Sequence, residues 1–172
     1  MTTEKRKFHT HHGNSATKPE ASTVFSQEKI TPKAAMGMTD EAVEEMYGQA
    51  YRLYNSGNYS DAVQLFRLLI MLNPMTSKYT LGLAACMHMM KEFRSAIELY
   101  TTCTALDPIS PFPLYYLSDC YIKIQDQFSA LVALEMTVKR AGEKPEYKVL
   151  KDRALLTMET LKRDLKKQGV LK

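Results

Sequence analysis

The chain has 172 residues, 45% of them hydrophobic, and a formal net charge of +4. That length supports one domain with its own core, so folding requires neither a metal ion nor a disulfide framework. The three cysteines include no closely spaced pair, which excludes a zinc knuckle or a CxxC redox site and fits a reducing compartment.

The opening residues are polar, unlike a signal peptide, and no apolar run approaches the length of a membrane span. We therefore expect a soluble protein that is not exported and does not insert into a membrane. Charge is distributed unevenly: residues 31–138 hold 7 basic and 11 acidic side chains, whereas residues 139–172 hold 11 and 5. The acidic middle disfavours a nucleic-acid surface spread over the core.

Residues 1–38 are predicted to form a flexible N-terminal arm, because they are polar and contain only isolated apolar side chains. A short helix at about 22–30 is compatible with the sequence and would dock on a partner or on a second copy. His9, His11 and His12 form a small cluster in this arm. We interpret the cluster as part of a solvated tail and expect no metal site, since no other ligands accompany it.

An internal repeat with a 34-residue period begins after the arm. Tyr59 to Ala62 aligns with Phe93 to Ala96, Asn73-Pro74 aligns with Asp107-Pro108, and a degenerate third copy keeps the same spacing. Small residues recur where paired helices would cross closely: Ala50, Ala84 and Ser118 on one helix, and Ala62, Ala96 and Ala130 on the other. This pattern is typical of tetratricopeptide repeats (TPRs), in which each repeat is a pair of antiparallel helices.

The sequence therefore predicts an all-α fold with three tandem TPRs in residues 39–142, at about 43–76, 77–110 and 111–142. Residues 143–172 are predicted to form a solvating helix and tail that cap the stack. We interpret the basic side chains of this last helix as a solvated face, with nucleic-acid or membrane binding as the alternative. Helices are expected at about 40–56, 59–72, 76–90, 93–106, 111–125, 128–141 and 146–167.

Tyr47, Tyr51 and Tyr54 are spaced by four and three residues on the first of these helices, so they share one face. First helices line the concave surface of a TPR stack, so this face should border a groove. Aromatic and aliphatic anchors with a few polar tips suit an extended peptide. The alternative is that the tyrosines complete the core or cover the arm. The candidate peptide-binding positions are Tyr47, Tyr51, Tyr54, Leu81, Ala85, His88, Tyr115, Asp119 and Ile122.

Nothing in the sequence predicts an enzyme or a cofactor site. The phosphate-loop, dinucleotide, serine-hydrolase and zinc-protease motifs are absent. Cys86, Cys103 and Cys120 are separated by half a repeat each time, which favours small buried packing residues over a catalytic thiol. The acidic residues of the repeats are mostly isolated at helix starts and ends, and no pair suggests acid–base catalysis.

Four local motifs are more specific than the 34-residue period: Gly82-Leu83-Ala84-Ala85-Cys86, Leu106-Asp107-Pro108, Pro111-Phe112-Pro113 and Ser118-Asp119-Cys120. With these motifs in this order, over about residues 40–140, the chain resembles the class II chaperones of bacterial type III secretion, the LcrH/SycD-like translocator chaperones. Two departures from the family pattern are Lys91, where a turn glycine is usual, and Gln125-Asp126-Gln127, which lacks the glycine before the sixth helix.

The resemblance implies a bacterial cytoplasmic chaperone that binds hydrophobic translocators before secretion and keeps them soluble and apart. Family members hold a short extended translocator segment in the concave groove, and many self-associate through the N-terminal region, so a homodimer is expected. No cofactor is implied. One alternative is a general TPR scaffold, although a clamp for a carboxyl terminus would place Lys, Arg and Asn where this chain has Tyr, Leu and Ala. Another is a regulator that joins a transcription factor once its client has left.

Overall fold

The computed structural model describes residues 32–169, and every regular element in that range is helical. The expectations for the arm before residue 32, namely its short helix, its histidines and its self-association, lie outside the described residues. The elements are α1 (Pro32–Ala35), α2 (Asp40–Asn55), α3 (Tyr59–Leu72), α4 (Ser77–Met89), α5 (Phe93–Leu106), α6 (Phe112–Lys123), α7 (Gln127–Ala141), the 3-10 helix η1 (Pro145–Tyr147) and α8 (Lys148–Lys167).

The helices expected from the sequence agree with α2 to α8 to within two residues at each end, and the predicted all-α fold is confirmed. Local chemistry explains where α2 begins. The Thr39 hydroxyl accepts a hydrogen bond from the Ala42 backbone N–H at 3.2 Å, and two acidic residues, Asp40 and Glu41, occupy the positive end of the helix. None of the helices within residues 32–169 is long and apolar enough to cross a bilayer.

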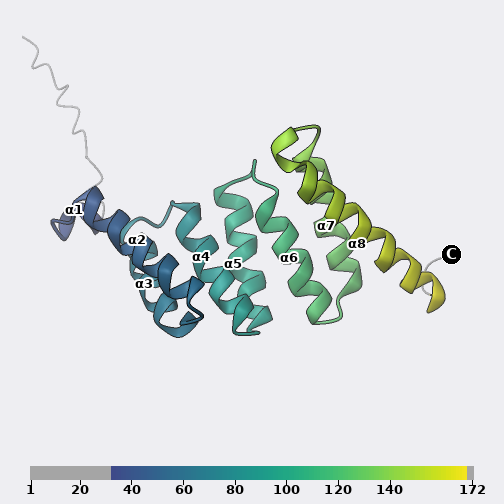
Figure 1. The fold of residues 1–172 in the computed structure, drawn as a ribbon, viewed down its shortest axis with the longest axis horizontal. Coiled ribbons are helices and arrows are strands. Elements are labelled where there is room, and N and C mark those ends of the chain that lie inside the picture. Colours follow the sequence, from purple (N-terminus) through teal and green to yellow (C-terminus); the bar gives the residue numbers. More distant parts are fainter. Residues whose placement is uncertain (1–31, 170–172) are drawn as a thin grey trace, which may run out of the picture.

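Consecutive helices pack side by side along an elongated stack, and α8 crosses α7 at the C-terminal end (Figure 1). Three clusters of buried side chains form the core. The first joins α2, α3 and α4, the second joins α4 to α7, and the third joins α7 and α8 and receives side chains from α6. Because neighbouring clusters share or touch a helix, the core is continuous along the stack.

The small residues that recur once per repeat are buried, as close helix crossing requires. A larger side chain at these positions would force the two helices of a repeat apart. The residues are Ala50, Ala62, Ala84, Ser118, Ala96 and Ala130, and each is at most 2% exposed.

The turn between the two helices of each repeat has a left-handed residue at the same position. These residues are Gly57, Lys91 and Gln125, with φ of 82°, 63° and 64°. In each turn the next residue donates its N–H to a carbonyl five residues back at 2.9 Å, namely Asn58 to Leu53, Glu92 to Met87 and Asp126 to Tyr121. The departures from the family's glycines therefore leave the turn geometry unchanged.

Replacing Lys91 or Gln125 by glycine is expected to raise the free energy of unfolding by about 0.5–1 kcal/mol each. Left-handed backbone costs a residue with a side chain about 1–2 kcal/mol, and the greater entropy of glycine in the unfolded chain offsets part of that gain. Urea unfolding measures the change. Gln64→Gly, at an exposed position inside α3, is the control and should lose about 1 kcal/mol. Lower stability of Lys91→Gly would contradict the argument.

Candidate peptide-binding groove

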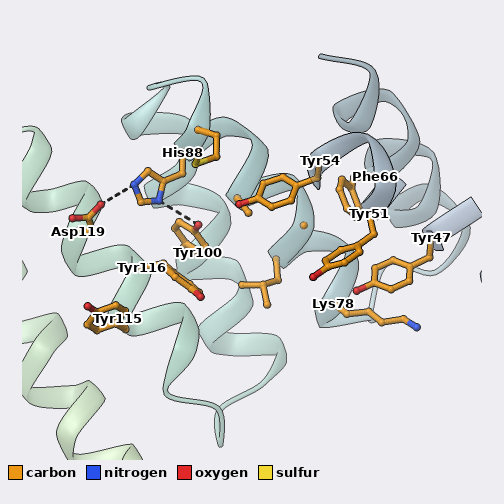
Figure 2. Close-up of a pocket in the computed structure, with 14 residues that line it drawn as sticks. Tyr47, Tyr51, Tyr54, Phe66, Lys78, His88, Tyr100, Tyr115, Tyr116 and Asp119 are labelled. Atoms are coloured by element: carbon orange, nitrogen blue, oxygen red, sulfur yellow. Dashed lines mark hydrogen bonds and ion pairs between the residues drawn. The ribbon is translucent and has the colours of Figure 1, made fainter. Parts of the chain in front are cut away.

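The first helices of the three repeats border a pocket of about 540 Å³, with floor residues supplied by second helices (Figure 2). Tyrosines of α2 stand on one side of it and residues of α6 on the other, with α4 between them. The lining residues are Tyr47, Tyr51, Tyr54, Phe66, Lys78, Leu81, Gly82, Ala85, His88, Met89, Tyr100, Tyr115, Tyr116 and Asp119.

The structure brings together every predicted groove position except Ile122. Ile122 is partly buried against the cluster that α7 and α8 form, and it does not line the pocket. Six lining residues were not predicted: Phe66, Lys78, Gly82, Met89, Tyr100 and Tyr116. The repeat spacing contains a signal for two of them, since Phe66 and Tyr100 are large aromatics at equivalent positions of successive second helices.

The α2 tyrosines divide their surface between core and groove. Tyr47 packs against Phe66 and Tyr79, with ring centroids 6.3 and 5.6 Å away, and burial raises the pKa of its phenol although the nearby Lys78 opposes the shift. Tyr51 stacks on Tyr47 at 6.5 Å and is 53% exposed. Tyr51 is therefore accessible from the groove, whereas Tyr47 also supports the core. A role of either tyrosine in peptide binding stays a prediction.

Small residues on α4 make the pocket hollow. A Cβ atom at Gly82 would lie 2.3 Å from the Phe66 ring, so only glycine lets that ring reach the pocket floor. Ala85 lies one turn further along α4 and also lines the pocket. The depression between the two aromatic sides therefore depends on the absence of bulky side chains in the middle of α4.

A hydrogen-bonded chain across α4, α5 and α6 forms the polar end of the pocket (Figure 2). His88 Nε2 lies 2.9 Å from Asp119 Oδ2, and His88 Nδ1 lies 3.4 Å from the Tyr100 hydroxyl. The carboxylate only accepts, so Nε2–H of His88 donates to Asp119, and in that tautomer Nδ1 is the acceptor that faces the Tyr100 O–H. The bond from His88 lowers the pKa of Asp119, and burial raises the pKa of Tyr100, which keeps its phenol protonated.

Lys78 provides a positive group at the opposite end of α4. Its Nζ lies 2.7 Å from Glu44 Oε2, and this hydrogen bond raises the pKa of the lysine. The same ammonium group lies 4.4 Å from the centre of the Tyr47 ring, within the range of a cation–π contact. The positive charge of Lys78 is thus partly neutralised by Glu44 and lies against the Tyr47 ring.

Comparison with known proteins gives a family match and several relatives. The tetratricopeptide repeat family matches residues 43–74 and 77–108, which contain most of α2 and all of α3, α4 and α5. The chain is 29% identical over 131 residues to the low calcium response locus protein H of Yersinia pseudotuberculosis, covering 76% of this chain and 77% of that protein. It is 28% identical over 135 residues to the chaperone protein SicA of Salmonella dublin, covering 78% and 79%.

A solved structure agrees with these relatives. The Yersinia enterocolitica type III secretion chaperone SycD, in complex with a peptide of the translocator YopD, superposes with a TM-score of 0.71 at 28% identity, over 73% of this chain and 96% of that one. The chain is thus similar in sequence and in fold to type III secretion chaperones. The resemblance predicted from the sequence motifs is therefore confirmed.

The relatives SicA and SycD are chaperones. The three cysteines of this chain lie in its interior. Burial raises the pKa of Cys86 to about 11 and those of Cys103 and Cys120 to about 12. All three thiols are fully buried and remain protonated at neutral pH, so they act as packing groups. Within residues 32–169 no group of His, Cys, Asp and Glu side chains is placed to hold a metal ion.

Asp119→Asn removes the negative charge from the His88–Asp119 hydrogen bond while it keeps an acceptor oxygen. We expect it to lower stability by about 0.5 kcal/mol at pH 7, a small value because Asp119 is half exposed. The folded-state pKa of Asp119 lies below its ordinary value of 3.8. The contribution is therefore complete at pH 5 and disappears as the pH falls through the folded-state pKa. Thermal unfolding at pH 7, 5 and 3 measures the difference from wild type.

Glu159→Gln is the matched control, since Glu159 is exposed and forms no ion pair within the described residues. Its stability should follow that of wild type at all three pH values. A deficit of Asp119→Asn that persists undiminished at pH 3 would contradict the assignment of the effect to the ionised carboxylate.

Proposed function

We propose that the chain is a cytoplasmic bacterial chaperone that holds an extended segment of a hydrophobic type III secretion translocator in its concave groove. The observation that carries the proposal is a tyrosine-lined pocket in a chain similar to SycD, whose solved structure contains a translocator peptide. The candidate contact residues are those of the pocket, above all the exposed Tyr51 and the hollow at Ala85.

The chemistry of the pocket suits a peptide rather than a small polar metabolite. A volume of about 540 Å³ accepts a few side chains at a time. The tyrosine rings and Leu81 supply apolar contact, while the tyrosine hydroxyls, Lys78 and Asp119 supply polar partners for a peptide backbone. An extended client segment satisfies both requirements, because it presents side chains and backbone groups in alternation.

Equilibrium binding is sufficient for the proposed activity. A leucine-sized side chain that becomes fully buried contributes about 1.5–3 kcal/mol, and the ordering of the client removes part of that gain. Binding keeps the apolar segment out of water and lowers the free concentration of aggregation-prone client. The complex remains reversible, so the client can be released without a reaction at the chaperone.

A carboxylate clamp is a weaker alternative for this groove. Lys78 is the one lysine or arginine among the lining residues, and its ammonium group is already paired with Glu44. A terminal carboxylate would have to compete with that pair. The regulatory alternative, in which the chaperone joins a transcription factor, stays a prediction because none of the described residues bears on it.

The test is co-expression with a hydrophobic translocator from the same secretion locus, followed by purification and size-exclusion chromatography. Wild type should give a soluble complex. Tyr51→Ala, which removes an exposed anchor, and Ala85→Phe, which fills the hollow, should each weaken binding at least tenfold while the helical circular dichroism is retained.

Phe128→Ala is the matched control, because Phe128 is an aromatic residue of α7 that is 55% exposed and does not line the pocket. It should bind like wild type. Failure of wild type to solubilise any translocator would oppose the chaperone function, and equal effects of Phe128→Ala and Tyr51→Ala would oppose the pocket as the binding site.

A further inference from the structure

The C-terminal helix occupies the place of a first helix in a fourth repeat. Helix α8 packs on α7 and touches α6, just as α4 packs on α3 and touches α2. The repeat spacing continues into it, since Cys86, Cys120 and Ala154 follow one another at that interval and all three are completely buried. Helix α8 is therefore in register with the three repeats.

Side-chain contacts join each first helix to the next, and the first two of them involve residues that line the pocket. An ion pair joins α2 to α4, the histidine–carboxylate bond joins α4 to α6, and an edge-to-face ring contact joins α6 to the residue directly before α8. The pairs are Glu44–Lys78 at 2.7 Å, His88–Asp119 at 2.9 Å and Phe112–Tyr147 at 5.8 Å between ring centroids. The row of first helices is thus continuous from α2 to α8.

Pocket-lining positions of the first helices have counterparts on α8 at the repeat spacing. Tyr115 corresponds to Val149 and Asp119 to Arg153, while Leu156 is in register with Tyr54 of α2 and His88 of α4. Val149 and Leu156 are 64% and 66% exposed, although both are apolar. We call Val149, Arg153 and Leu156 the α8 shelf. None of the three lines the pocket between α2 and α6, so the shelf lies beyond it along the row.

A capping role alone does not explain this surface. Asp152 follows Ser118 by one full repeat length, at the position where each repeat buries a small residue against its second helix. No second helix follows α8 within the described residues, and a polar residue suits that exposed position. Val149 and Leu156, which are in register with pocket-lining residues of other first helices, are also exposed, yet they are apolar. Apolar side chains that face water in register with a binding groove indicate a contact surface.

We propose that the α8 shelf extends the binding groove and holds the client segment after it leaves the pocket. This inference rests on the proposed function. The shelf suits a segment with apolar, acidic and apolar side chains, because Arg153 stands between Val149 and Leu156 and forms no ion pair in the part of the chain that the structure describes. The surrounding charge has the same sign, since residues 139–172 hold 11 basic and 5 acidic side chains.

The geometry also sets where on the client the contact falls. Helix α8 packs mainly on α7 and only touches α6. A client segment in extended conformation, which advances about 3.3 Å per residue, therefore reaches the shelf only with residues beyond those that lie against α6. A peptide that fills only the pocket does not touch α8, whereas one a few residues longer at the correct end does.

Two adjacent leucines of α8 provide the test. Leu156 lies on the shelf, whereas Leu155, 40% exposed, is the repeat counterpart of Tyr121 and lies on the face where a second helix would pack. The probe is the translocator co-expressed from the same locus, together with overlapping synthetic peptides that cover its sequence. Leu156→Glu should weaken binding of the translocator at least tenfold, and Leu155→Glu less than twofold.

Peptide truncation separates the shelf from the pocket. The longest tightly bound peptide should lose affinity for wild type when the residues beyond the pocket are removed, and the truncated peptide should bind Leu156→Glu and wild type equally. Equal effects of the Leu155 and Leu156 variants, or full binding by Leu156→Glu, would overturn the shelf. If Tyr51→Ala still abolishes that binding, the chaperone function stands; if wild type binds no translocator, both proposals fail.

Discussion

Close crossing of the two helices in each repeat determines the rest of the architecture. Alanine at Ala50 and Ala62 in the first repeat, and at Ala84 and Ala96 in the second, lets the helix axes approach without a side chain between them. Once each second helix is held tightly behind its first helix, the first helices form one row and their outer faces form one surface. Nothing else in the chain has to specify a groove, since it results from repetition of the same contact.

The shape of the groove depends both on aromatic side chains along its sides and on small residues in its middle. The α2 tyrosines and the Tyr115–Tyr116 pair form two aromatic sides, while Gly82 and Ala85 keep the space between them open. The Phe66 and Tyr100 rings lie beneath the hollow and are almost completely buried, so they support it from below. The more exposed Tyr51 borders the hollow from the side.

The sequence predicts the fold well because it contains two regular spacings, the helical period and the 34-residue repeat. Helical periodicity places Tyr47, Tyr51 and Tyr54 on one face, and the longer repeat transfers that face to α4 and α6. Residues on second helices escape this argument, since Phe66 reaches the pocket only through the gap that Gly82 leaves. Ile122 differs for the opposite reason, because its side chain packs against the α7–α8 cluster, and that packing is a tertiary contact. The left-handed turns at Lys91 and Gln125 show that a repeat geometry persists without its usual glycine.

Two polar contacts along the groove, one an ion pair and one a histidine–carboxylate hydrogen bond, fall at opposite ends of the same helix. Lys78 is the second residue of α4 and holds α2, while His88 is its second-to-last residue and holds α6. Helix α4 is therefore connected to both neighbouring first helices, once near each of its ends, and these contacts hold the three helices in place without a ligand. A pre-organised groove of this kind loses little conformational entropy when it binds a peptide, and it selects its ligand by shape rather than by closing around it.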